Sequence, residues 1–253
     1  MILGRVYDMS GHSKWHNIQM KKGKTDAARG KIFTKIGREI AIAVREGGPD
    51  PSINAKLRDV VNKAKSNNMP NDNIQRSIKK AAGEGTGENY KEATYEGYGP
   101  AGTAIIVECI TDNLNRTASD VRHCFEKSGG SLGATGCVSW MFDRKGIILV
   151  PAEGLDEDEV MMDAVEAGAN DVNLNEDYFE IETDPNEVGT VREALEGKYT
   201  IESAEASLVP QNTTDPAGED LERLQKILDM LDDLDDVSEV YHNANLPEEE
   251  EED

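Results

Sequence analysis

The order of apolar segments in the third quarter of the chain limits the fold more than any other feature of the sequence. Four segments read as strands from apolar or alternating residues, and two read as helices from apolar residues at helical spacing. In chain order they are strand 146–150, helix 156–167, strands 171–174 and 178–183, helix 186–195 and strand 199–208. This order is that of a split βαβ, or ferredoxin-like, unit. We expect a compact domain here, with Val160, Met161, Ala164 and Val165 of its first helix facing the core.

The segments on either side of this unit predict a second α/β domain that the unit interrupts. Residues 103–110 form a nearly unbroken apolar run, typical of a strand buried on both faces, and a helix at 115–128 and a short strand at 138–142 follow. A long helix at 215–231 and a strand at 237–241 have no partner in the ferredoxin-like unit. We expect them to complete the sheet that begins at Thr103.

The chain is therefore predicted to be an α+β protein of three domains, with the third domain inserted in the second. The predicted boundaries are a helical N-terminal domain at 1–83, a discontinuous middle domain at 84–136 with 209–243, and the inserted domain at 137–208. Residues 1–8 precede a second methionine, Met9, and read as an extension. Residues 244–253 end in six acidic residues, which predict a disordered tail.

The N-terminal domain is predicted to be a small antiparallel unit of three helices. The first helix spans about 25–46 and ends at Gly47, and the second spans about 52–66. The third begins at Asn71, a residue type that often caps helices and that here follows Pro70. Short connections between these helices favour neighbours that pack directly against one another.

Charge is divided between the two ends of the chain. Residues 1–91 carry 18 Lys and Arg against 9 Asp and Glu, whereas the remaining 162 residues carry 9 against 41. The first part therefore has a charge of +9 and the second a charge of −32, which gives the net charge of −23. A compact basic region attracts phosphate locally, because charges beyond about 8–10 Å are screened by salt.

The basic residues of the N-terminal domain lie mostly opposite its apolar faces. On the first helix they are opposite a stripe that includes Ile36 and Ile40, and on the third they are opposite Ile74 and Ile78. One such face is commonly just solvated, but several faces of one sign favour a phosphate-binding surface. The predicted nucleic-acid-binding residues are Lys14, Trp15, Lys21, Lys22, Lys24, Lys31, Lys35, Arg38, Arg45, Lys63, Lys65, Arg76, Lys79 and Lys80.

Trp15 has two interpretations. It can provide a stacking platform for an unpaired base, or it can anchor the basic arm onto the helices, which is the more common use of a large aromatic ring.

The sequence does not indicate an enzyme. It has no nucleophile-elbow, Walker A, zinc-protease or dinucleotide-binding motif, and we expect neither a catalytic residue nor a cofactor. His12 and His16 are four residues apart but lack a third metal ligand nearby, so no metal site is predicted. The three cysteines form no C-x-x-C pair, and no segment is apolar enough to span a membrane. These features predict reduced thiols and a cytoplasmic protein.

Several motifs resemble the YebC/PmpR family. They are Gly11-His12-Ser13-Lys14-Trp15, Arg29 to Lys35, Asn68 to Ile74, Tyr95 to Pro100, Thr111 to Thr117 and Gly129 to Gly133. The resemblance covers about residues 9–241 and implies three domains with the third inserted in the second. It also implies a non-enzymatic transcriptional regulator that binds DNA. Mitochondrial relatives, which include the translational activator of cytochrome c oxidase, act in translation, and bacterial relatives are linked to the ribosome.

Three functions remain open at this point. The first is a DNA-binding transcriptional regulator that uses the basic N-terminal surface. The second is a ribosome-associated translation factor that binds ribosomal RNA with the same surface and relieves stalled translation. The third is a protein–protein adaptor whose acidic domains form the main interface. An acidic body is repelled along a long duplex, which makes local docking on structured RNA physically as plausible as DNA binding.

Overall fold

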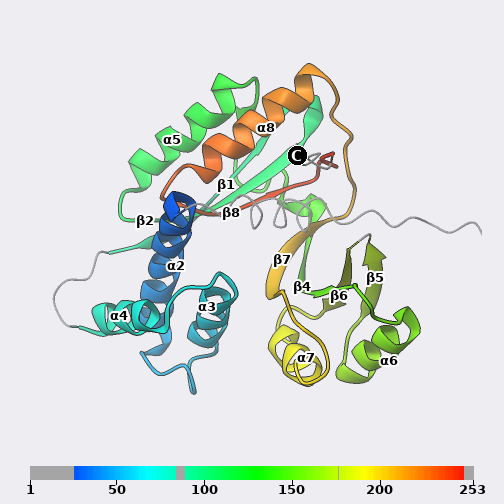
Figure 1. The fold of residues 1–253 in the computed structure, drawn as a ribbon. Helices are drawn as coiled ribbons and strands as arrows, with labels where there is room; N and C mark the ends of the chain where they lie inside the picture. The colour runs from blue at the N-terminus through cyan, green and yellow to red at the C-terminus, as the bar shows by residue number, and fades with distance from the viewer. Residues whose placement is uncertain (1–25, 84–88, 176, 248–253) are drawn as a thin grey trace, which may run out of the picture. The chain divides into compact units, whose positions relative to one another are not determined.

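The structure is a computed structural model that describes residues 26–83, 89–175 and 177–247 (Figure 1). The predicted extension at 1–8, the basic arm around Trp15, residues 84–88 and the acidic residues 248–253 lie outside this part of the chain. Residues 143–209 form one compact unit, and the described residues before and after them form a second. Within the described ranges, no helix has the length and apolar character needed to cross a membrane.

Three helices begin the second unit, namely α2 (Asp26–Gly47), α3 (Ala55–Ser66) and α4 (Asn71–Ala82). Their apolar faces meet in one buried cluster, to which α2 contributes Ile36 and Ile40. The predicted three-helix N-terminal domain is therefore present, and its core is made by the residues at helical spacing that the sequence indicated.

Asn54 determines where α3 begins. Its side-chain oxygen accepts a hydrogen bond from the N–H of Leu57 at 3.0 Å, which satisfies one of the free donors at a helix start. Its amide nitrogen donates to the carbonyls of Ala43 and Gly48, each at 2.8 Å. One buried side chain thus caps α3 and ties it to the end of α2, so the predicted start at residue 52 is three residues early.

The middle domain contains an antiparallel sheet with the strand order β3-β1-β2-β8. Its strands are β1 (Lys91–Tyr98), β2 (Ala104–Thr111), β3 (Ser131–Leu132) and β8 (Val237–His242). Strand β8 comes from the end of the chain and pairs with β2, which confirms that the two segments of this domain complete one sheet.

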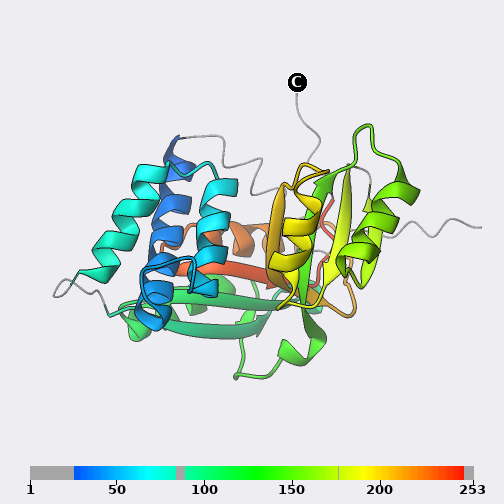
Figure 2. The same cartoon turned by 90° about the horizontal axis from the view of Figure 1, so that it is seen from below.

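The two faces of this sheet are covered by different helices. Helices α5 (Leu114–Lys127) and α8 (Glu219–Asp232) enclose the main core of the domain on one face. Helix α2 contacts β2 and β8 from the other side, as Figures 1 and 2 show. The N-terminal helices therefore dock on the middle domain through α2.

The unit at 143–209 has the predicted element order. Its elements are β4 (Phe142–Pro151), α6 (Glu157–Ala167), β5 (Asp171–Asn175), β6 (Tyr178–Thr183), α7 (Val188–Leu195) and β7 (Ser203–Pro210). The strand order is β5-β6-β4-β7, as in a ferredoxin-like sheet, and residues of α6 and α7 share its core with β4 and β6. The predicted α+β fold with an inserted third domain is confirmed.

Several local predictions are wrong. The segment 138–142 does not form a strand, because residues 139–141 make a short 3-10 helix, η2 (Ser139–Met141), before β4 begins. Strand β1 was not predicted at all. Asn71 is the first residue of α4 and not its cap, and Pro70 before it offers no side-chain hydrogen bond. On α6, Met161 and Val165 are exposed, and only Val160 and Ala164 are buried.

Candidate nucleic-acid interface

The basic face of α2, formed by Lys31, Lys35, Arg38 and Arg45, is turned toward the middle domain. Lys31 Nζ lies 2.6 Å from Asp233 Oδ1, and Lys35 Nζ lies 2.8 Å from Asp232 Oδ1. Lys35 also donates to the backbone carbonyl of Asp232 at 2.9 Å, where α8 ends. A cation at this point offsets the negative end of the helix dipole as well as the carboxylate.

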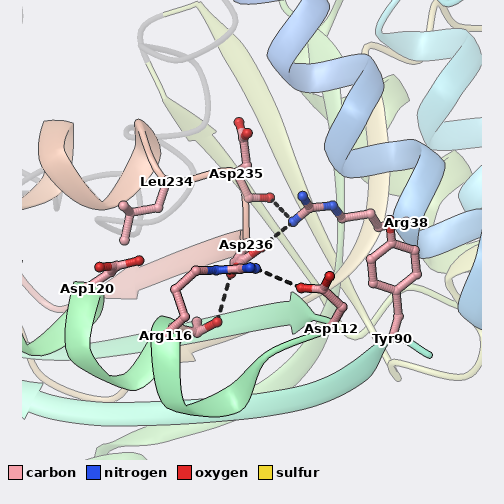
Figure 3. A pocket seen from close by; sticks show the side chains of 9 residues that line it. Arg38, Tyr90, Asp112, Arg116, Asp120, Leu234, Asp235 and Asp236 are labelled. Carbon is pink, nitrogen blue, oxygen red and sulfur yellow. Dashed lines mark hydrogen bonds and ion pairs between the residues drawn. The ribbon is translucent and has the colours of Figure 1, made fainter. Parts of the chain in front are cut away.

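Arg38 makes the most buried of these contacts. Its Nη1 lies 2.6 Å from Asp236 Oδ1, and the side chains of Arg38 and Asp236 are only 16% and 10% exposed. Arg116 of α5 reaches the other carboxylate oxygen of Asp236 with its Nη2 at 2.7 Å. Asp236 is therefore held between two guanidinium groups that come from different domains, as Figure 3 shows.

Two hydroxyl groups complete the surroundings of Asp236. Thr117 donates to its Oδ2 at 2.8 Å and Thr111 does so at 3.1 Å. Burial alone raises the pKa of Asp236, but the hydrogen bonds from Arg116, Thr117, Arg38 and Thr111 outweigh burial and hold that pKa below its ordinary value. Asp236 is consequently ionised at neutral pH and serves as the centre of the junction between α2 and the sheet.

The pocket beside Asp236 has a volume of about 410 Å³. Its walls include Arg38 and Arg116, whose guanidinium groups are both bonded to Asp236, and the carboxylates of Asp112, Asp120, Asp235 and Asp236. Four carboxylates and two guanidinium groups leave an excess of negative charge. A recess of this composition does not attract phosphate, and we interpret it as part of the domain junction (Figure 3).

The remaining predicted cations near this junction also have partners. Lys63 of α3 forms ion pairs with Glu39 of α2 and with Glu239 of β8. Arg45 donates to the backbone carbonyl of Tyr90 at 2.5 Å. Each of these predicted site residues therefore already has a partner within the protein in the arrangement that the structure describes.

A different group of predicted cations is exposed at the surface. Helix α4 buries Ile74 and Ile78 and exposes Arg76, Lys79 and Lys80 on its opposite side, a group that we call the α4 basic face. Lys65, in the last turn of α3, is exposed as well. The structure thus brings Arg76, Lys79 and Lys80 together on one helix. The arm residues Lys14, Trp15, Lys21, Lys22 and Lys24 lie outside the described residues.

The acidic partners of α2 were not predicted from the sequence. Five aspartates occur between residues 229 and 236, at the C-terminal end of α8 and just beyond it. Acidic residues are unfavourable at the C-terminus of a helix because its free carbonyls carry partial negative charge. This unusual placement was the signal that these aspartates have cationic partners elsewhere in the chain.

In the described part of the chain, the three cysteine thiols are not activated as nucleophiles, and no metal site is present. Burial is the main cause that raises the pKa of the Cys109, Cys124 and Cys137 thiols, in the case of Cys109 to about 12. These thiols stay protonated and are therefore weak nucleophiles at neutral pH. Within the described residues, no group of three or more His, Cys, Asp or Glu is placed to hold a metal ion.

Comparison with known proteins identifies relatives over nearly the whole chain. Residues 13–84 match the TACO1/YebC protein N-terminal domain, and residues 90–244 match the TACO1/YebC second and third domain. Relatives named probable transcriptional regulatory protein from Clostridium novyi and Clostridium tetani are 57% and 58% identical over 243 residues. Each alignment covers 95% of this chain and 99% of the relative.

A solved structure extends this likeness to three dimensions. The crystal structure of a conserved hypothetical protein from Aquifex aeolicus superposes with a TM-score of 0.81 at 47% sequence identity. The match covers 91% of this chain and 96% of the Aquifex protein. Both the predicted family and the predicted domain content are confirmed, and the chain belongs to the TACO1/YebC family.

Proposed function

We propose that this protein is a non-enzymatic regulator of gene expression that binds nucleic acid through the exposed basic surface of its helical domain. In this proposal the surface consists of the α4 basic face, Lys65 and the basic arm. The observation that carries it is the exposure of Arg76, Lys79 and Lys80 on one side of a helix whose other side is buried. Grouped cations that point to solvent are what phosphate binding requires.

The cations of α2 have a different role in this proposal. Lys31, Lys35 and Arg38 hold the helical domain on the middle domain by pairing with aspartates. They orient α2, and α4 packs against α2 and so is positioned by the same junction. In the described arrangement they support the binding surface without being its main contacts.

Two nucleic acids suit this surface, and a different observation favours each. The names of the relatives favour a transcriptional regulator, and hence DNA. The charge of −32 on residues 92–253 favours structured RNA such as ribosomal RNA, because a local docking site keeps an acidic body away from neighbouring phosphates. Crosslinking in cells followed by sequencing of the bound nucleic acid distinguishes the two, by enrichment of promoter DNA or of ribosomal RNA.

Replacing the α4 basic face by glutamine tests the surface itself. The triple variant Arg76→Gln, Lys79→Gln, Lys80→Gln keeps the helix and removes three positive charges. We expect it to bind a labelled 20-base-pair duplex and a labelled RNA hairpin at least tenfold more weakly at 0.1 M salt. The slope of log affinity against log salt for the duplex should fall by about 3, since each lost phosphate contact removes about 0.9.

The control has the same net charge. Arg122→Gln, Lys127→Gln, Lys226→Gln removes three exposed cations from α5 and α8 of the middle domain. Long-range attraction is reduced equally in both variants, so only local contacts distinguish them. Equal binding by the two triple variants would show that the α4 basic face is not the interface.

A further inference from the structure

The inserted domain carries a long acidic segment that nucleic-acid binding does not explain. Between Lys145 and Arg192 the sequence has no Lys or Arg and has fourteen Asp and Glu. Such a segment repels phosphate, whether in nucleic acid or at an anionic membrane surface. Any ligand that it attracts electrostatically is cationic.

Exposed apolar side chains gather in the same segment. Nine large apolar side chains are exposed in the part of the chain that the structure describes, and five of them fall within residues 155–174. They are Leu155, Met161, Met162, Val165 and Leu174. Scattered exposed apolar residues are normal on soluble proteins, but a concentration of them marks an interaction surface.

Helix α6 arranges three of these side chains as a stripe. At 100° per residue, Met161, Val165 and Met162 fall within an arc of about 100°, away from the buried Val160 and Ala164. Met162 and Val165 are 65% and 60% exposed, so most of their apolar surface is in contact with water. We call these three residues the α6 stripe.

Strand β5 places a fourth apolar side chain on the same side of the sheet. Leu174 is two residues from Val172, which packs in the core beneath the helices, and alternate residues of a strand point to one face. Helix α6 packs against β5, which is an edge strand of the sheet. Leu174 is therefore on the helix-covered face, at the edge next to α6.

Carboxylates flank the α6 stripe. On the helical wheel, Glu157 lies on one side of the arc that the stripe covers, and Glu166 lies on the other side. Asp158 lies within the arc, one turn before Met162. All three carboxylates are exposed. Lys198 binds on a different side of the helix, where it pairs with Glu159 and Asp163. The stripe is thus apolar in the middle and acidic around its margin.

We propose that the α6 stripe is a docking surface for a basic amphipathic segment of another protein. Such a segment places apolar residues on Met161, Met162 and Val165 and directs Lys or Arg to the surrounding carboxylates. The two methionines suit this use because unbranched thioether side chains adapt to different apolar partners. Helix α6 has 11 residues and is about 16 Å long, which matches roughly three turns of a bound helix.

The test uses the full chain and a defined probe. The probe is a fluorescein-labelled 18-residue peptide of Leu and Lys that is amphipathic as a helix, compared with a scrambled peptide of equal composition. The test variant is Met162→Gln with Val165→Thr, which keeps side-chain size and removes apolar surface. The control variant is Leu114→Gln with Ile53→Thr, since both residues are exposed elsewhere.

We expect the amphipathic peptide to bind more tightly than the scrambled peptide by fluorescence anisotropy at 0.15 M salt. The test variant should weaken this binding at least tenfold and the control variant should not change it, while hydrogen exchange slows at residues 157–167 in the complex. Equal binding of both peptides, equal binding by both variants, or protection elsewhere in the chain overturns the proposal. Sedimentation that shows a dimer only for chains with the intact stripe also overturns it, since a second copy then covers this face.

Discussion

Replacing Asp236 by asparagine removes the charge at the centre of the junction between α2 and the middle domain and changes the shape of the side chain very little. Asp236 accepts bonds from Arg38 at 2.6 Å, Arg116 at 2.7 Å, Thr117 at 2.8 Å and Thr111 at 3.1 Å. In the variant, the amide NH2 points its hydrogens at groups that are themselves donors. The two guanidinium groups then lose their shared counter-charge.

The expected cost follows from burial. Removing one partner of a fully buried ion pair destabilises a protein by about 3–5 kcal/mol. Arg38 is 16% exposed and fits that case, whereas Arg116 is 46% exposed and recovers much of its solvation from water. We therefore expect Asp236→Asn to lower the free energy of unfolding by about 2–3 kcal/mol. For a chain of this size that is a decrease in Tm of about 5–10 °C.

Asp235→Asn is the matched control. Asp235 is adjacent, exposed and carries the same charge, and it receives the Arg38 bond on its backbone carbonyl, which the substitution leaves in place. Its Tm should change by less than about 2 °C, since exposed substitutions usually alter stability by no more than about 0.5 kcal/mol. Differential scanning fluorimetry at pH 7 measures both variants.

The same pair of variants has a defined pH dependence. The pKa of Asp236 is lower in the folded protein than in the unfolded chain, so its stabilisation is present above the unfolded pKa of about 3.9. That stabilisation is lost as the pH falls through the folded pKa. The difference in Tm between the parent and Asp236→Asn should be constant from pH 7 to pH 5 and become smaller below pH 4. A Tm for Asp236→Asn within 2 °C of the control at pH 7 refutes the assignment of Asp236 as the centre of the junction.

Two further predictions concern a buried cap and a buried histidine. Asn54→Ala should lower the free energy of unfolding, measured with urea, by about 2–3 kcal/mol, because it removes the cap of α3 and leaves two carbonyls without their donor. The control Asn71→Ala should lower it by less than about 0.5 kcal/mol. Burial lowers the pKa of His242 to about 4, so the folded state resists its protonation and stability falls by about 3 kcal/mol between pH 6.5 and pH 4. In thermal melts, Tm should decrease less between pH 6.5 and pH 4 for His242→Gln than for the parent or for the exposed-site control His123→Gln. An equal decrease in Tm for all three proteins would contradict the buried, neutral state of His242.

The sequence predicted the fold well wherever local periodicity determines burial. The apolar residues of α2 and the alternation in β6 gave the correct element types, and the unpaired segments after residue 208 indicated the discontinuous domain. Strand β1 was missed, and it contains Gly97, a residue type that weakens a strand pattern. In the structure a side chain at Gly97 would come within 2.6 Å of the Ser131 carbonyl and 2.7 Å of Phe125, so this glycine allows β3 and α5 to approach a strand.

The polar side of a helix was harder to interpret than its apolar side. A helical wheel shows that Lys31, Lys35 and Arg38 lie opposite the apolar stripe, but it cannot show what that side meets. Their partners, Asp233, Asp232 and Asp236, are about 200 residues away in the sequence. On α6, by contrast, the pattern suggested a wider buried face than one sheet can cover, and Met161 and Val165 remain at the surface.

These ion pairs change the meaning of the charge division along the chain. Lys31, Lys35, Arg38 and Lys63 count toward the charge of +9 on residues 1–91, yet each lies against a carboxylate from residues 232–239. In the described arrangement these four cations and their partners largely cancel at distances beyond a few ångströms. Arg76, Lys79 and Lys80 of the α4 basic face are exposed and take no part in these four pairs. In the proposed function, the acidic part of the chain orients the basic domain through these specific pairs, and the phosphate backbone binds on the side of the α4 basic face.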